Sequence, residues 1–307
     1  MNFELSEDQV LLRDGLRSLC HGRFTSERVR KGFDGGVFDE LGDTGVFSLR
    51  TDGFGWADAA ITFEELGRAL VPGPLVWSHL AHGLVDGIVT GVERPGPGQP
   101  AMVEHLAKSD TVAMVADDGI AIVATDALTS AAPLDWPLDP LTPVHRVDAL
   151  PVGDVIADAD VVADWRHAGA VLTSAYQVGM ATACTEAATA YSLERYQFDR
   201  PVGSFQAVKH ILADMAVRAE VARAAVHAAA VTLDDPGVGD MERAISGARV
   251  LAGEASVANA KGSMQVHGGM GFTWELDVHL YLKRAWLLNT TFGSPAAHAD
   301  ALANLLS

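Results

Sequence analysis

The sequence predicts a mainly helical α+β fold, and three observations lead to this class. Apolar residues recur at helical spacing through much of residues 1–94 and again through 163–307. A turn-rich segment of Pro and Gly at 93–100 ends the first zone, and short runs typical of β-strands follow it. We therefore expect an N-terminal helical domain (1–94), a small β-domain (95–162) and a C-terminal bundle of long helices (163–307).

The N-terminal zone carries clear helix signals. Ser6 followed by Gln9 predicts a capping box ahead of an apolar helix face. A second helix is expected over 58–70, where apolar residues share one face, and Pro72 should end it. A third helix is expected over 75–89.

The middle zone contains four candidate strands. Residues 111–115 and 120–124 read as a hairpin, with Asp-Asp-Gly at 117–119 as its turn. Further strands are expected at 144–148 and 154–156. A β-domain of this size is too small for an independent core, so we expect it to pack against the helical zones.

The C-terminal zone predicts long antiparallel helices. Apolar side chains recur at helical spacing over 172–191 and again over 205–219. A third helix, over about 239–266, is rich in Ala, which permits close helix approach, and Gly268-Gly269 should end it as a C-cap.

Composition excludes several classes of function. The 307 residues carry 40 acidic against 22 basic side chains, a formal net charge of −18. Such a surface repels nucleic acid and anionic lipid, so neither partner is expected. No basic and apolar leader opens the chain, and we expect a cytoplasmic protein. Cys20 and Cys184 have no metal-ligand spacing and are expected to be buried free thiols.

Two motif segments carry chemistry. The first runs over 191–202, where Arg195 stands at a helix end beside a proline-fixed loop. A fixed guanidinium can bind a diphosphate bidentately, and Phe198 can pack on a flat ring. The second runs over 265–272, where the Gly-Gly pair lets a ligand approach the backbone and Gln265 can hydrogen-bond an adenine or ribose edge. Taken singly, an arginine at a helix end usually complements the helix dipole, and a glycine pair is usually a C-cap.

In this order and spacing the motifs closely resemble the C-terminal helical domain of acyl-CoA dehydrogenases, over roughly residues 165–295. The family's N-terminal pattern is echoed by residues 5–9 and 64–70. The resemblance implies a helical domain, a β-domain and a four-helix domain. It also implies assembly as dimers or dimers of dimers, with FAD at the interface between subunits.

The resemblance further implies which residues reach that FAD. One set would contact the diphosphate and adenosine half of a cofactor held mainly by the neighbouring subunit, a second would pack near the adenine, and a third would complete the contact. The set at the diphosphate and adenosine is Arg195, Gln197 and Phe198. The set near the adenine is Phe205 and Val208, and the set that completes the contact is Gln265, Gly268 and Gly269.

The catalytic residue of the family is missing. Family members carry a glutamate, commonly in a Tyr-Glu-Gly-Thr segment, that removes the α-proton of the thioester. The matching segment here is 291–294, and Phe292 stands at the glutamate position; a phenyl ring cannot act as a base. Some members place the base on another helix, but the helix start expected at 166–171 has no carboxylate. Glu275 and Asp277 could serve instead, although acids at a helix start usually have a structural role.

The β-domain also departs from the family. The usual Thr-Glu-Pro and Gly-Ser-Asp segments, which hold the flavin ring and thioester, have no match between residues 102 and 162. The chain resembles short actinobacterial members that work as heterotetramers with full-length catalytic subunits. Its run at 271–285 is similar to members that act on steroid-CoA substrates. The sequence therefore predicts a subunit of an FAD-dependent acyl-CoA dehydrogenase whose full-length partner supplies the catalytic glutamate for an acyl-CoA.

Two alternatives stay open at this point. The chain could be a self-sufficient homomeric enzyme that uses Glu275 or Asp277 as its base. It could also be a flavin-free interaction protein that keeps the fold. No metal site is expected, because His267, His279 and His298 lack ligand companions at helical spacing.

Overall fold

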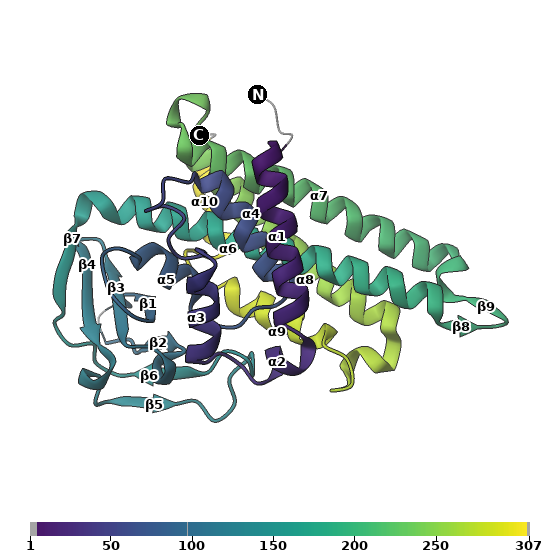
Figure 1. Cartoon of the computed structure of the whole chain (residues 1–307), viewed down its shortest axis with the longest axis horizontal. Helices are drawn as coiled ribbons and strands as arrows, with labels where there is room; N and C mark the ends of the chain where they lie inside the picture. The colour runs from purple at the N-terminus through teal and green to yellow at the C-terminus, as the bar shows by residue number, and fades with distance from the viewer. Residues whose placement is uncertain (1–4, 97, 306–307) are drawn as a thin grey trace. The chain divides into compact units, whose positions relative to one another are not determined.

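The computed structural model describes residues 5–96 and 98–305, and helices account for most of it (Figure 1). The chain forms two compact units, each built from separate stretches of sequence. The first unit comprises Met1–Ser26, Trp56–Val71 and Val171–Ser307, and the second comprises Glu27–Gly55 and Pro72–Ala170. The predicted mainly helical α+β class is confirmed, while the division at residues 94 and 162 stays a prediction.

The first unit is helical. Its short elements connect the long helices and are β8 (Tyr196–Gln197), β9 (Arg200–Pro201), η3 (Val202–Ser204), η4 (Pro236–Val238) and η5 (Gly268–Phe272). Its long helices are α1 (Glu7–Arg23), α4 (Trp56–Arg68), α6 (Ala159–Glu194, from residue 171 onward), α7 (Gln206–Asp234), α8 (Met241–His267), α9 (Val278–Leu288) and α10 (Pro295–Asn304).

The predicted capping box opens α1. The Ser6 hydroxyl accepts a hydrogen bond from the Gln9 amide at 3.2 Å, and the Gln9 side chain accepts from the Ser6 amide at 3.1 Å. The side-chain Nε2 of Gln9 donates to the Asp58 carboxylate on α4 at 2.9 Å. One residue therefore both caps α1 and attaches it to α4.

Two glycines set the distance between α4 and α6. A Cβ atom on Gly67 would lie 1.9 Å from the carbonyl oxygen of Tyr176, and one on Gly179 would lie 1.9 Å from that of Glu64. Real Cβ atoms do not approach a backbone oxygen so closely, so only glycine fits at either position. The helix backbones are in direct contact at this crossing.

The second unit combines helices with two small sheets. Its helices are α2 (Ser26–Arg30, of which Ser26 falls in the first unit), α3 (Gly35–Asp43) and α5 (Leu75–Ala81), with η1 (Leu106–Lys108) and η2 (Thr125–Ala127). Its strands are β1 (Val89–Glu93), β2 (Ala101–Glu104), β3 (Thr111–Ala116), β4 (Gly119–Ala124), β5 (Ala131–Pro133), β6 (Val144–Val147) and β7 (Asp154–Asp158).

The strand order is β1-β3-β4-β7 in one sheet and β2-β6-β5 in the other. The predicted hairpin is confirmed, because β3 and β4 pair antiparallel and Ala116 faces Gly119 across the turn. β1 pairs parallel with β3, and the remaining pairs are antiparallel. Val103, Val112, Met114 and Val147 belong to one buried apolar cluster between these strands.

Two helix boundaries were predicted wrongly. The helix expected over 75–89 ends at Ala81, and Val89 already begins β1. Gly83 and Gly87 follow the helix with positive φ, which breaks the helical path, and the Ser78 hydroxyl bonds the backbone of Val89. α6 begins at Ala159, seven residues before the expected start at Arg166.

Burial of His79 makes the stability of the second unit pH-dependent. Its Nδ1 donates to the carbonyl of Val46 at 2.9 Å, and burial lowers the pKa of the imidazole to about 4. The unfolded chain takes up this proton near pH 6.5, so stability is lost as the pH falls from there toward 4. We expect the free energy of unfolding to drop by about 2 kcal/mol between pH 7 and pH 5 from this group.

Urea denaturation at several pH values measures the slope. His79→Gln cannot take up the proton, so the variant should lose that share of the pH dependence. Equal slopes in the two proteins would contradict the assignment to His79.

Candidate cofactor interface

A short hairpin carries the first motif. β8 and β9 pair antiparallel, and Phe198 and Asp199 form the turn between them with φ of 52° and 62°. Positive φ at both turn residues suits the twist of a two-residue hairpin, but it costs a non-glycine residue about 1 kcal/mol or more. The Phe198 side chain is 87% exposed. The chain therefore holds an apolar ring in solvent on strained backbone, which is a frequent sign of a binding function.

Arg195 stands at the base of this hairpin. Its amide donates to the Tyr191 carbonyl at 2.9 Å, and its carbonyl accepts from Val202 at 2.7 Å, which closes the hairpin. The side chain is exposed. Within residues 5–96 and 98–305 no carboxylate lies within ion-pair distance of its guanidinium, so its donors can bind an anion.

Phe205 and Phe198 form an aromatic pair, with ring centroids 6.2 Å apart at 78°. The Arg200 guanidinium lies 4.0 Å from the Phe205 centroid and covers one face of that ring. Arg200 adds a second cation to the hairpin and was not among the residues predicted from the sequence. Val208 is half-buried on the first turn of α7. Gln197 donates from its side chain to the Tyr196 carbonyl, so its amide oxygen remains as an acceptor.

The second motif ends α8. Gln265 is exposed, and Gly268 caps the helix with φ of 62°. A Cβ atom on Gly268 or Gly269 would meet no atom within 4 Å, so open space borders both glycines. Gly271 differs, because its Cβ would lie 2.8 Å from the Met264 carbonyl oxygen. A ligand can therefore approach the backbone at Gly268 and Gly269, whereas Gly271 allows close packing against Met264.

The structure brings the two motifs to the same end of the helical unit. The ring of Tyr191, in the last turn of α6, lies 4.3 Å from the ring of His267, the last residue of α8. Figure 1 shows the β8–β9 hairpin and the end of α8 at this same end. Exposed residues of these two segments include Arg195, Phe198, Gln265, Gly268 and Gly269. Such a surface is suited to contact a ligand that a second chain also holds.

Phe292, which the sequence predicts to stand where the family has its base, is buried. Phe292 is 5% exposed and has φ of 48°. His298 donates from Nε2 to the Phe292 carbonyl at 3.0 Å, and its Nδ1 lies 2.9 Å from the Ser246 hydroxyl on α8. These hydrogen bonds fix the backbone at Phe292 to α8, and the Phe292 ring is buried inside the protein.

Arg249 holds the same turn, and the sequence analysis missed it. Its side chain is fully buried and donates to the carbonyls of Leu288 and Thr291 and to the Gln177 side chain. Burial lowers the pKa of the guanidinium to about 10, so it stays charged near neutral pH. An arginine among the many Ala, Gly and Ser residues of α8 was the available sequence signal.

The two alternative bases lie just before α9. Glu275 is exposed, and Asp277 is the residue before the first turn of α9, although its side chain makes no capping hydrogen bond. Both carboxylates lie near a helix N-terminus, where negative charge is favourable. Their use as a base stays a prediction.

The sequence predictions also concern the two cysteines, the acidic and histidine side chains and the helices. Cys20 and Cys184 are buried and free, as predicted, and burial raises the pKa of both thiols. In the described part of the chain no group of three or more His, Cys, Asp or Glu side chains could hold a metal ion. No helix among those residues is long and apolar enough to cross a membrane.

The exposed arginine and aromatic rings of the hairpin, at the same end of the helical unit as the open glycine pair, mark a candidate cofactor surface. Residues 166–306 match the family described as acyl-CoA dehydrogenase, C-terminal domain. Acyl-CoA dehydrogenase IpdE2 of Mycolicibacterium smegmatis is 32% identical, over 92% of this chain and 93% of the relative. IpdE2 of Mycobacterium tuberculosis is 34% identical over 75% of this chain and 71% of the relative. The chain belongs to the acyl-CoA dehydrogenase family.

Solved structures agree on the fold. The ChsE4–ChsE5 complex from Mycobacterium tuberculosis contains a chain with a TM-score of 0.83 and 22% identity, covering 100% of this chain and 99% of that one. A Tcur3481–Tcur3483 steroid acyl-CoA dehydrogenase variant has a TM-score of 0.83 and 20% identity, with 98% of each chain covered. The protein is thus of the acyl-CoA dehydrogenase class of oxidoreductases, whose cofactor is FAD.

Proposed function

We propose that this chain is a subunit of an FAD-dependent acyl-CoA dehydrogenase that completes the FAD site at a subunit interface, while a full-length partner supplies the catalytic glutamate. The reaction is α,β-desaturation of a CoA thioester, and the acyl group is steroid-derived. One observation carries this proposal: the chain keeps the exposed residues that would contact FAD, yet buries a phenyl ring where the base belongs.

The exposed surface fits the adenosine and diphosphate half of FAD. Arg195 offers unpaired guanidinium donors that match diphosphate oxygens, and Phe198 offers a free ring face to a flat base. Open space beside Gly268 and Gly269 admits the cofactor to the backbone, and Gln265 is exposed next to it. Phe205 would contribute its uncovered face, because Arg200 already lies over the other.

The division of labour follows from the side chains. FAD, when bound, supplies the acceptor for the hydride that leaves the β-carbon. Arg195 would hold the diphosphate and Phe198 would pack on the adenine, but Phe292 has no lone pair and cannot take the α-proton. Proton removal therefore falls to a carboxylate on the partner subunit.

Two features support a mixed assembly with a steroid-derived substrate. The similar solved structures include two-chain assemblies, and one of them carries the word steroid in its description. The run at 271–285 is similar to family members that act on steroid-CoA. We infer the substrate class and the heterotetramer from these likenesses.

Flavin content and molar mass test the proposal. The chain would be purified alone and after co-expression with a full-length acyl-CoA dehydrogenase from the same organism. We expect a colourless chain alone and a yellow mixed tetramer with one FAD per pair of chains.

The other outcomes identify the alternatives. A yellow homomer that reduces its own FAD with an acyl-CoA would mean that Glu275 or Asp277 acts as the base. A colourless mixed complex would mean that the chain is an interaction protein that has lost its flavin.

A further inference from the structure

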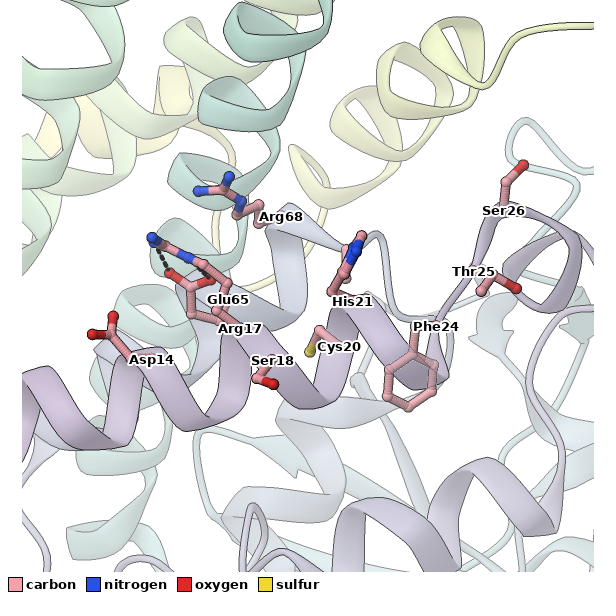
Figure 2. Close-up of a pocket in the computed structure, with 11 residues that line it drawn as sticks. Asp14, Arg17, Ser18, Cys20, His21, Phe24, Thr25, Ser26, Glu65 and Arg68 are labelled. Carbon is pink, nitrogen blue, oxygen red and sulfur yellow. Dashed lines mark hydrogen bonds and ion pairs between the residues drawn. The ribbon is translucent and has the colours of Figure 1, made fainter.

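A cavity lies between α1 and α4, within the first unit and away from the candidate cofactor residues along the sequence (Figure 2). Its volume is about 740 Å³, which lies in the range of small-molecule sites. Three segments line it: the second half of α1, the residues 24–26 that follow it, and the end of α4. These segments all belong to the same unit.

The inner wall of the cavity is apolar. Cys20 and Phe24 are buried and contribute their side chains, and Ala69 contributes its methyl group from α4. Burial raises the pKa of the Cys20 thiol to about 12, so this side chain behaves as a small neutral hydrophobe. An apolar wall of this kind offers water few hydrogen bonds, and an apolar ligand body gains from displacing it.

One end of the cavity carries two arginines. Figure 2 shows Arg17 and Arg68 next to each other, on the side opposite Phe24. Arg17 binds the Glu65 carboxylate with two hydrogen bonds of 2.6 and 3.0 Å, and Glu65 is 2% exposed, so this pair is internally neutral. Arg68 contacts Glu186 through one nitrogen, Nη2, at 2.5 Å.

The arginine end can still accept an anion. Arg68 has five N–H donors, and within the described residues only its contact through Nη2 to Glu186 involves a carboxylate. The side chain of Arg68 is 27% exposed, so its remaining donors reach solvent at the cavity. His21 and Asp14 also line the cavity, and the Asp14 carboxylate is paired with Arg13 at 2.8 Å. The cavity therefore pairs an apolar wall with an end where Arg68 has free N–H donors.

We propose that this cavity binds a carboxylic acid with a bulky apolar body, whose carboxylate is bound by Arg68 and whose body packs against Cys20, Phe24 and Ala69. The volume favours a rigid polycyclic acid over a short linear chain, because a small ligand would leave much of the apolar wall in contact with water. This site is separate in sequence from the cofactor surface and does not depend on the proposed function. It gives the subunit a ligand site of its own.

Calorimetric titration of the full chain with cholate, below the concentration at which it forms micelles, tests the site. Cholate combines a rigid polycyclic body with one carboxylate, and methyl cholate has the same body without the charge. We expect saturable cholate binding and about tenfold weaker binding of methyl cholate. Absence of saturable cholate binding, or equal affinity for the two compounds, would overturn the proposal.

Three variants locate the binding. Arg68→Met keeps the side-chain length without the donors and should weaken cholate about tenfold, while leaving methyl cholate unchanged. Ala69→Leu reduces the cavity and should weaken both compounds. Arg243→Met, on an exposed arginine at the start of α8 outside this cavity, should bind both as the natural chain does. Circular dichroism verifies that each variant folds, and unaltered cholate affinity in folded Arg68→Met and Ala69→Leu proteins would place the binding elsewhere.

Discussion

Replacement of Arg195 by alanine is expected to weaken FAD retention in the mixed complex by about 10- to 100-fold, which corresponds to the loss of one charge-assisted contact. Arg195 is exposed and free of carboxylate partners in the part of the chain that the structure describes, so its removal should leave the fold unchanged. The FAD diphosphate would lose its cationic partner from this subunit.

The measurement is flavin absorbance per complex after extensive dialysis, together with the assembled mass. Arg195→Lys should retain an intermediate amount, because an ammonium group keeps the charge but cannot bind a diphosphate bidentately. Arg146→Ala, a surface arginine in the other unit, should retain the natural amount. Full flavin content in the Arg195→Ala complex would show that Arg195 does not hold the cofactor.

Replacement of Gly179 by alanine is expected to lower the free energy of unfolding by at least about 4 kcal/mol. Losses of this size occur when a substitution forces packed backbones apart. The new methyl carbon would lie 1.9 Å from the Glu64 carbonyl oxygen and 2.6 Å from the Arg68 amide nitrogen. No side chain can move aside to relieve this contact, because both atoms belong to the backbone of α4. The two helices would have to separate along the whole crossing.

Urea denaturation followed by circular dichroism measures the loss. Gly15→Ala is the matched control, since a Cβ at this position of α1 meets no atom within 4 Å. That substitution should stabilise the protein by about 0.5–1 kcal/mol, because alanine is the better helix former. A Gly179→Ala protein as stable as the natural chain would mean that α4 and α6 do not pack as closely as described.

Local signals in the sequence were reliable where neighbouring residues decide the structure. The capping box of Ser6 and Gln9 and the hairpin turn at 117–119 depend on contacts within a few residues, and both formed as predicted. The helix expected over 75–89 is wrong beyond Ala81, because Gly83 and Gly87 adopt positive φ and Ser78 bonds the backbone of Val89.

The candidate cofactor residues were found through their order along the chain, but their arrangement was not. Arg195 and Gly268 are far apart in sequence, and the stacking of Tyr191 on His267 places their segments at one end of the helical unit. Arg200 was not predicted because a single arginine beside a turn has no distinctive pattern, and the signal at Arg249, an arginine among small residues, does not indicate its partners. Their roles follow from the rings and carbonyls that folding places beside them.

The sequence by itself determined the family and the mainly helical class, because these depend on residue identity and spacing, and it predicts the loss of the base at Phe292. The tertiary structure alone decided that Phe292 is buried, that Gly67 and Gly179 allow direct backbone contact, and that Arg17 and Arg68 border an apolar cavity. Each of these depends on side chains distant in sequence that share the same space. Close packing and charge pairing act through space, and only the folded chain shows which residues they join.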